Sequence, residues 1–471
     1  MRGISTLQPS LSPPASTTAW TFTNESFIEN SDAKEWLKDG KLRLSWGVLG
    51  NQVNSLYSYT DMYTIENLND QIAYLWASKG NQNITWERSN TIDLGLEFSI
   101  SKYLDAEIDY FWKLTDNMIS PRAVAPSLGY SSIPTNDAKM VNTGVEFQFD
   151  IHAVDMRNVK LDFKLNGAHY KNYMTQMPID YYDADGTPHR MTMNGAMSEG
   201  HSYYDHYTIR YLGVNPTNGE SLFEAYYDSR DGDFMAAKAD GTYNYIPSLH
   251  QWLLDQKNDG VENPEQYLRT TYTNDPTTAA SQYVGKSYLP DLSGGFGFDL
   301  EVYGVTLSAS CSYQIGGYGY DYTYMALMDN KQVGGHNWHV DVRNAWTENN
   351  PGHGTLDAAG NVDMTSLNPL DIPRMSNGVG QYDNYANTAS TRFLTSNSFL
   401  SLNNVQVGYN FPKKLIEKIK LQKLHLYVAA TNLCIATARR GYTPMTSFTG
   451  SSDTHGYSPL STIVGGIKFT F

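Results

Sequence analysis

The sequence lacks features that would assign it to several common classes of protein. Its two cysteines, Cys311 and Cys434, are too few for a disulfide framework. No run approaches the roughly 18 consecutive apolar residues of a transmembrane helix. The net charge of −15 argues against nucleic acid as a partner and against a basic membrane-surface patch. Any insertion of this chain into a membrane must therefore be as strands of a β-barrel.

Motifs of catalysis and metal binding are also missing. The sequence contains no HExxH, Walker, GxSxG or CxxC pattern, so we expect neither an enzyme nor a cofactor. Asp183-Ala-Asp185-Gly186 begins like a calcium loop but lacks the acidic residue at the twelfth position. We interpret it as an external turn, with loop-bound Ca²⁺ as the alternative. His336 and His339 have no third ligand nearby, and we expect a surface pair rather than zinc.

Alternation of apolar and polar residues is the main positive signal. It is clearest in residues 92–98, 104–112, 145–151 and 159–165. An alternation with a period of two residues suits a sheet with one face in hydrocarbon and the other in water. Soluble β-sandwiches also alternate, but Asp105, Glu107 and Asp109 place three charges on one strand face, which favours a water-filled lumen. The 35 tyrosines and nine tryptophans, at a mean hydropathy of −0.47, suit the aromatic girdles of a membrane barrel.

The last ten residues have the pattern of a closing barrel strand. Ile463, Ile467, Phe469 and the terminal Phe471 share one face, and Lys468 lies on the other. We therefore predict Ile467, Phe469 and Phe471 to be the barrel-assembly terminus, with the strand ending at the periplasm.

Thirteen segments in all have a strand-like pattern, so the predicted strand count is about 13. They lie near residues 18–24, 41–51, 91–100, 103–118, 140–153, 159–172, 202–213, 220–227, 290–302, 305–324, 398–411, 423–433 and 462–471. Short and long connections alternate between them after the first. Such alternation is typical of an outer-membrane barrel, with the long connections outside the cell. The predicted fold class is thus all-β, a transmembrane antiparallel β-barrel.

The C-terminal third carries a specific resemblance. The run Phe399-Leu-Ser-Leu-Asn-Asn-Val-Gln-Val-Gly-Tyr-Asn-Phe-Pro412 resembles the signature hairpin of SusC/RagA-type TonB-dependent outer-membrane transporters. Similar segments accompany it in the family's order, at residues 42–52, 86–90, 213–219, 290–295, 426–433 and 441–444. The resemblance covers about residues 17–471. It departs from the family pattern at Arg439, Arg440 and Thr443, so we expect the surface chemistry of that external loop to differ.

The resemblance implies a function. Transporters of this family have a barrel of roughly 22 strands, and this chain would be its C-terminal part, without the plug domain. Residues 1–16 match no element of the family, and we expect them to be a disordered, non-family leader. The parent would take up oligosaccharides or peptides across the outer membrane of a Gram-negative bacterium. Its partners would be TonB, a SusD-like surface lipoprotein and outer-membrane lipid, with no nucleic acid.

The isolated chain would not be transport-competent, since the energy-coupling box and plug would lie upstream of it. Two other classes remain open at this point. A passive porin or autotransporter barrel would explain the strands but not the run Phe399–Pro412. A secreted carbohydrate-binding β-sandwich would explain the aromatic residues but not the alternation of loop lengths.

Two local patterns complete the prediction. The apolar residues Leu400 and Leu402 are even-numbered before Asn403-Asn404, whereas Val405 and Val407 after it are odd-numbered. One extra residue at this place would be a β-bulge. Four tyrosines recur at every second residue, Tyr318, Tyr320, Tyr322 and Tyr324. They would form a ligand-binding ladder inside the outer mouth if the strand continues. If Gly316-Gly317 is a bulge, they would turn outward into the headgroup girdle, and the sequence does not decide between the two.

Overall fold

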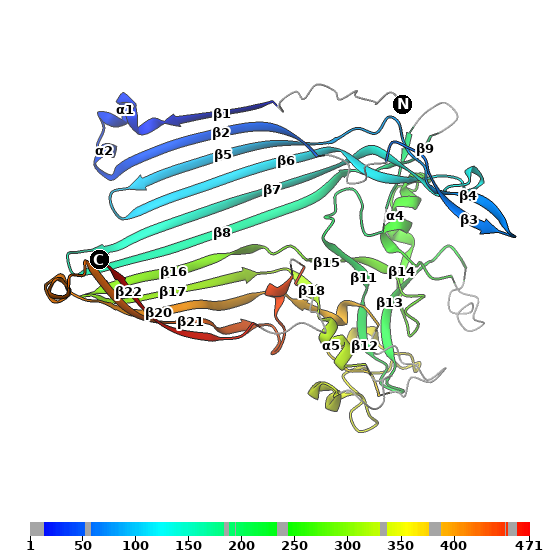
Figure 1. Cartoon of the computed structure of the whole chain (residues 1–471). Coiled ribbons are helices and arrows are strands. Elements are labelled where there is room, and N and C mark those ends of the chain that lie inside the picture. Colours follow the sequence, from blue (N-terminus) through cyan, green and yellow to red (C-terminus); the bar gives the residue numbers. More distant parts are fainter. Residues whose placement is uncertain are drawn as a thin grey trace.

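The computed structural model describes residues 14–51, 58–182, 188–193, 195–232, 244–329, 337–375, 388–447, 449–450 and 459–471. Within these residues the largest element is one antiparallel sheet of 11 strands, which forms a curved wall (Figure 1). Its strands, in spatial order, are β1 (Ala15–Thr21), β2 (Leu37–Asn51), β5 (Glu87–Ile100), β6 (Leu104–Ala123), β7 (Ser132–Asp155), β8 (Val159–Gln176), β16 (Leu292–Val302), β17 (Val305–Ile315), β20 (Phe399–Asn410), β21 (Lys423–Thr437) and β22 (Thr462–Thr470). The spatial order follows the chain order, which is the topology of an up-and-down barrel wall.

The two ends of this sheet differ in their connections. At the end where the chain terminates, short turns join β5 to β6, β7 to β8 and β16 to β17 (Figure 1). Three four-residue helices lie in the remaining connections at this end, α1 (Ser26–Glu29), α2 (Ala33–Trp36) and α6 (Lys413–Ile416). The long connections leave from the opposite end. The all-β barrel fold is therefore confirmed, although the described sheet is open rather than closed. The predicted alternation of short and long connections holds only in part, because only residues 124–131 join β6 to β7, where the sequence predicts a long connection.

The two faces of the sheet differ as the sequence predicts. Apolar side chains on one face remain open to the surroundings, such as Leu94, Phe163 and Val407, whose exposed fractions are 42%, 42% and 51%. A soluble monomer rarely leaves an apolar surface of this extent uncovered. Such a face is typical of a membrane barrel, whose outer wall carries an apolar band. No helix among the described residues is long and apolar enough to cross a membrane.

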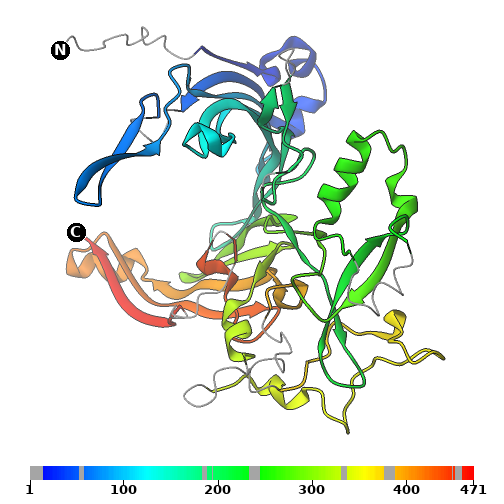
Figure 2. The same ribbon diagram turned by 90° about the vertical axis from the view of Figure 1, so that its right-hand side faces the viewer.

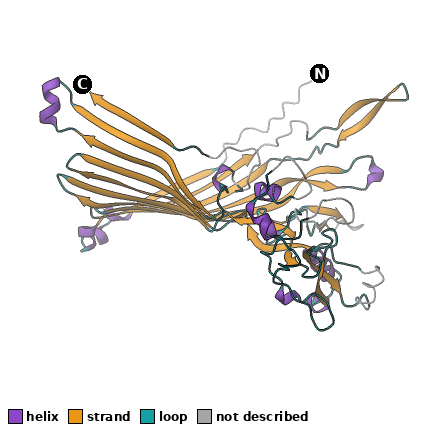
Figure 3. Ribbon diagram, turned by 90° about the horizontal axis from the view of Figure 1, so that it is seen from below, coloured by secondary structure: helices purple, strands orange, loops and turns teal. Residues whose placement is uncertain are grey.

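The two longest connections fold into a separate lobe beyond the rim of the sheet, which Figure 2 and Figure 3 show from two directions. Its elements are β9 (Ile179–Tyr182), β10 (Pro188–Arg190), β11 (Asp205–Ile209), β12 (Tyr211–Val214), β13 (Ser221–Asp228), α4 (Leu249–Asn258), β14 (Leu268–Thr273), β15 (Ser281–Ser287), β18 (Tyr318–Tyr320), α5 (Tyr322–Leu327) and β19 (Leu394–Ser396). A smaller hairpin of β3 (Met62–Leu68) and β4 (Gln71–Ser78) extends from the connection between β2 and β5. The lobe has its own buried residues, among them Tyr211, Phe223 and Phe393.

Two of the predicted barrel strands are wrong. Residues 202–213 and 220–227 do form strands, but these are β11, β12 and β13, which pair within the lobe and not in the large sheet. The adjacent residues Leu222 and Phe223, which point to opposite faces of β13, are both 1% exposed. A barrel wall would leave one of them facing water or lipid. The prediction divides the residues between β8 and β16 into three connections and two barrel strands. In the structure they are one long insertion.

The predicted bulge is confirmed. Opposite β17, Ser310 pairs with Asn404 and Cys311 pairs with Leu402, so Asn403 has no partner in the register. The pairing with β21 shifts at the same place, where Asn432 adopts a φ of 52°. The register of β20 thus shifts against both of its neighbours at Asn403. This extra residue lets the even-numbered apolar residues before it and the odd-numbered ones after it lie on the same face of the wall.

Candidate ligand-binding surface at the rim of the sheet

The polar face of the sheet is lined by ion pairs. Arg43 on β2 lies at their centre, with its Nε 2.6 Å from Glu97 and its Nη2 3.0 Å from Asp109. The same guanidinium hydrogen-bonds Glu107. The strand register aligns these residues, because Glu97 pairs with Glu107 across β5 and β6. Glu107 and Asp109, which the sequence predicts to share one strand face, thus both lie on the ion-paired polar face of the wall.

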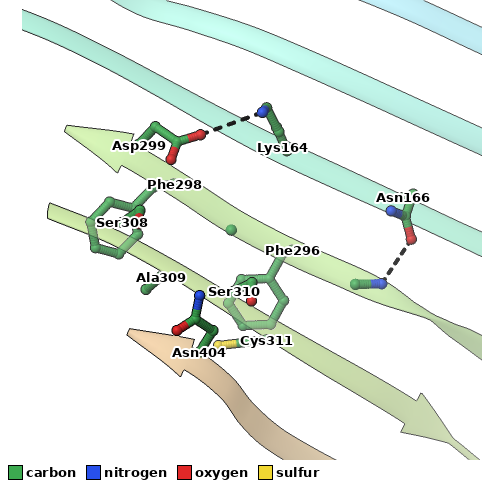
Figure 4. Close-up of a pocket in the computed structure, with 12 residues that line it drawn as sticks. Lys164, Asn166, Phe296, Phe298, Asp299, Ser308, Ala309, Ser310, Cys311 and Asn404 are labelled. Carbon is green, nitrogen blue, oxygen red and sulfur yellow. Dashed lines mark hydrogen bonds and ion pairs between the residues drawn. The ribbon is translucent and has the colours of Figure 1, made fainter. Parts of the chain in front are cut away.

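Figure 4 shows a shallow cavity of about 340 Å³ in the part of the wall formed by β8, β16, β17 and β20. An ion pair of 3.3 Å between Lys164 and Asp299 lies at one end. At the other end, the backbone N–H of Gly295 donates to the side chain of Asn166 at 2.9 Å. The glycines of β16 add no side chain, so the wall is recessed here. The cavity offers a small polar recess without a nucleophile paired to a base.

The four tyrosines do not form the predicted ladder. β17 ends at Ile315, and Gly316 and Gly317 follow with φ of 76° and 74°. Two consecutive left-handed residues redirect the chain, which then forms β18 and α5. The residues of the set are distributed over these two elements, with Tyr318 and Tyr320 on β18 and Tyr322 and Tyr324 on α5. The continuous strand 305–324 is therefore wrong, and so are both orientations derived from it, whereas the ligand-binding role stays a prediction.

Tyr318 and Tyr320 pack on the neighbouring pair of strands, β11 and β15. Tyr320 donates its hydroxyl to Thr208 at 2.9 Å, and the Nε2 of His206 is 2.8 Å from the carbonyl oxygen of Tyr318. The ammonium of Lys286 lies over the Tyr318 ring, 4.1 Å from its centroid. These contacts bring the tyrosines together with a cation, a grouping that the sequence did not predict because the partners are far apart along the chain.

Tyr322 and Tyr324 have different surroundings. Tyr322 is 40% exposed, and its ring stacks on that of Tyr320 at 5.6 Å. Tyr324 is 8% exposed and donates its hydroxyl to Asp341 at 3.0 Å, and burial, helped by this bond, raises the pKa of Tyr324 to about 12. Of the four, Tyr322 is thus the most accessible to a ligand, and Tyr324 is a core residue.

Arg439, where the sequence departs from the family pattern, has a structural role that sequence reasoning missed. Its guanidinium lies 3.3 Å from the centroid of the Tyr324 ring and 3.2 Å from Asp321. Asp321 also accepts the backbone N–H of Tyr324 and so caps α5. The loop after β21 is thereby attached to the lobe. Tyr442 in the same loop is 2% exposed and donates its hydroxyl to the carbonyl oxygen of Gly450 at 2.6 Å.

The other predicted sites are located as follows. Ile467 and Phe469 on β22, and Phe471 directly after it, are 64%, 53% and 78% exposed, and their role in assembly stays a prediction. Asp183, Asp185 and His336 lie outside the described residues. No group of three or more His, Cys, Asp or Glu side chains in the described ranges could hold a metal ion.

Comparison with known proteins gives relatives of one class. The TonB-dependent receptor P3 of Formosa agariphila is 23% identical over 447 residues, which cover 92% of this chain and 38% of that protein. The TonB-dependent receptor SusC of Bacteroides thetaiotaomicron is 25% identical over 183 residues, covering 36% of this chain and 18% of SusC. The structure of the RagAB peptide importer in the open-open state matches with a TM-score of 0.69 at 21% identity, covering 98% of this chain and 42% of that one. No family model matches.

The fold is that of the barrel of a TonB-dependent outer-membrane transporter. The more specific resemblance, to SusC/RagA-type transporters, is confirmed by the relatives, of which this chain spans about two fifths at most. These relatives are receptors and transporters rather than enzymes.

Proposed function

We propose that residues 17–471 form the C-terminal half of the barrel of a SusC-like transporter in the outer membrane of a Gram-negative bacterium. Three observations support this proposal. The large sheet has 11 strands, half of the roughly 22 in this class of barrel. Its outermost described strands are β1 and β22, and neither closes the sheet on the other. An open sheet edge is not tolerated in hydrocarbon, so both edges require strands from elsewhere.

The complete protein, in this proposal, imports oligosaccharides or peptides, with energy transmitted by TonB and with a SusD-like lipoprotein at the surface. The relative RagAB is described as a peptide transporter, and SusC as a TonB-dependent receptor. The lobe contributed by the loops of this chain lies beyond the rim, where ligand and lipoprotein would arrive. The isolated chain, with both edges of its large sheet unpaired, would not transport. Ala15 and Ser16, which the sequence predicts to lie in the leader, already belong to β1 and pair with Gly47 and Trp46, so the leader ends before residue 15.

The observation that carries the proposal is the combination of an uncovered apolar face with an ion-paired polar face on one sheet. Uptake by whole cells tests it. Cells that lose the full-length transporter should lose growth on its cognate oligosaccharide or peptide and regain it from a plasmid copy. The surface lipoprotein should co-purify with that copy. Unchanged uptake after deletion would contradict a transport function.

A further inference from the structure

The rim of the sheet carries a cation that no described carboxylate neutralises. Lys286 is half-buried at the end of β15, and its ammonium contacts the Tyr318 ring. It makes no ion pair with any residue that the structure describes. The ammonium of Lys286 is thus partly desolvated, and its described partner is the face of the Tyr318 ring.

The charged groups around Lys286 have other partners. Arg210 is the cation whose charge acts on Lys286, and its Nε lies 3.2 Å from the carboxylate of Glu224. Asp205 accepts the N–H of Ser202 at 3.1 Å and lies 3.5 Å from His201. Burial, and then the positive charge of Arg210, lowers the pKa of Lys286. An anion bound beside the ammonium would relieve both effects.

Two further tyrosines follow Tyr318, the residue whose ring this ammonium contacts, along the chain. Tyr318 and Tyr320 belong to β18, and Tyr322 follows at the start of α5. Tyr320 and Tyr322 are nearly parallel, with an interplanar angle of 24°. Among the described residues the hydroxyls of Tyr318 and Tyr322 make no hydrogen bond. We call this group, Lys286 with Tyr318, Tyr320 and Tyr322, the rim subsite.

The rim subsite lies at the end of the sheet from which the long connections leave. β15 leads within a few residues into β16, and β18 follows β17 after Gly316 and Gly317. The backbone N–H of Asp291 donates to the carbonyl oxygen of Ile315 at 2.9 Å, which joins these two connections at the rim. The subsite is thus joined to the ends of the barrel strands β16 and β17 by short connections.

We propose that the rim subsite binds an acidic oligosaccharide, with a carboxylate or sulfate group on Lys286 and a sugar ring against the tyrosines. Flat rings with polar edges suit the apolar faces and the hydroxyls of sugars. The four residues include no aliphatic side chain, whereas a peptide site would need apolar pockets for side chains. This inference rests on the proposed transport function and specifies the ligand class for it.

The test uses the full-length transporter, purified in detergent, and calorimetric titration with oligosaccharides of equal length that are neutral, uronate-containing or sulfated. Lys286→Gln should weaken binding of a charged ligand roughly tenfold or more and leave the neutral one unchanged. Lys286→Arg should retain most of the affinity, and Tyr318→Phe should retain the stacking while losing one hydroxyl. Lys257→Gln is the matched control, since Lys257 is an exposed lysine of the same lobe.

Tighter binding of the uronate-containing or the sulfated oligosaccharide than of the neutral one supports the proposal. Comparison of the two charged oligosaccharides identifies which anion is preferred. Equal affinity of Lys286→Gln and the unaltered protein for the charged ligands would overturn it. So would binding of a glutamate-rich peptide with no binding of any saccharide. If the unaltered protein takes up neither saccharide nor peptide in cells, the proposed transport function fails instead, and the two failures are distinguishable.

Discussion

Arginine substitution on the two faces of β21 should have very different effects on barrel assembly. Val428 is 54% exposed on the apolar face, where it pairs with Val407 on β20 and Gly465 on β22. Tyr427, its neighbour, lies on the polar face and stacks on His425 at 5.6 Å. If the apolar face meets lipid, Val428→Arg places a charge in hydrocarbon, whereas Tyr427→Arg places it in water.

The strand geometry gives the size of the effect. β21 begins at Lys423, and at about 3.3 Å per residue with a tilt near 45° Val428 lies roughly 12 Å along the membrane normal from that end. This is about the middle of an apolar band of roughly 25 Å. Arginine there costs about 2–4 kcal/mol, a factor of roughly thirty to several hundred in the folding equilibrium. Tyr427→Arg should lose only a stacking contact of about 0.5–1.5 kcal/mol.

Heat-modifiability on gels measures the outcome in the full-length transporter, because a folded barrel migrates differently before and after boiling. We expect Val428→Arg to reduce the folded fraction severely and Tyr427→Arg to leave most of it. Leu426→Arg, on the same face as Val428, should resemble Val428→Arg. Equal tolerance of both faces would refute the assignment of the apolar face to lipid.

Two further predictions concern the lobe and the packing of the wall. Arg439→Gln should remove the cation of Arg439 from the carboxylate of Asp321, which is 4% exposed. The loop at 438–447 should then be cleaved faster by added protease, while heat-modifiability is retained. Unchanged cleavage would mean that Arg439 does not attach the loop. Gly294→Ala should reduce assembly because its Cβ would clash with the carbonyl oxygen of Asn166, whereas Gly47→Ala should not, since its Cβ would lie 3.6 Å from that of Ala15. Equal folded fractions in the two alanine variants would contradict the close approach of β8 and β16.

The barrel strands were predictable because lipid and water impose a two-residue period on each of them. The bulge was predictable for the same reason, since Leu402 and Val405 can share a face only if one residue between them is unpaired. The lobe was not, because its strands also alternate, and nothing in residues 220–227 shows that both faces are covered. Only the pairing of β12, β13 and β14, far from the large sheet, distinguishes them.

The tyrosine cluster shows a second limit. Spacing alone placed four tyrosines on one face, but the left-handed Gly316 and Gly317 end the strand before the first of them. Lys286 joins Tyr318 through folding of the insertion between β8 and β16, a contact between distant parts of the chain that periodicity does not encode.

Expression of these 471 residues alone, with a signal sequence, tests the central claim most directly. If the 11-stranded sheet is half of a barrel, its two edges remain unpaired, and the chain should give no heat-modifiable species and no substrate uptake. Co-expression of the upstream half of the full-length transporter should restore both. A heat-modifiable, uptake-competent product from the 471 residues alone would contradict the account.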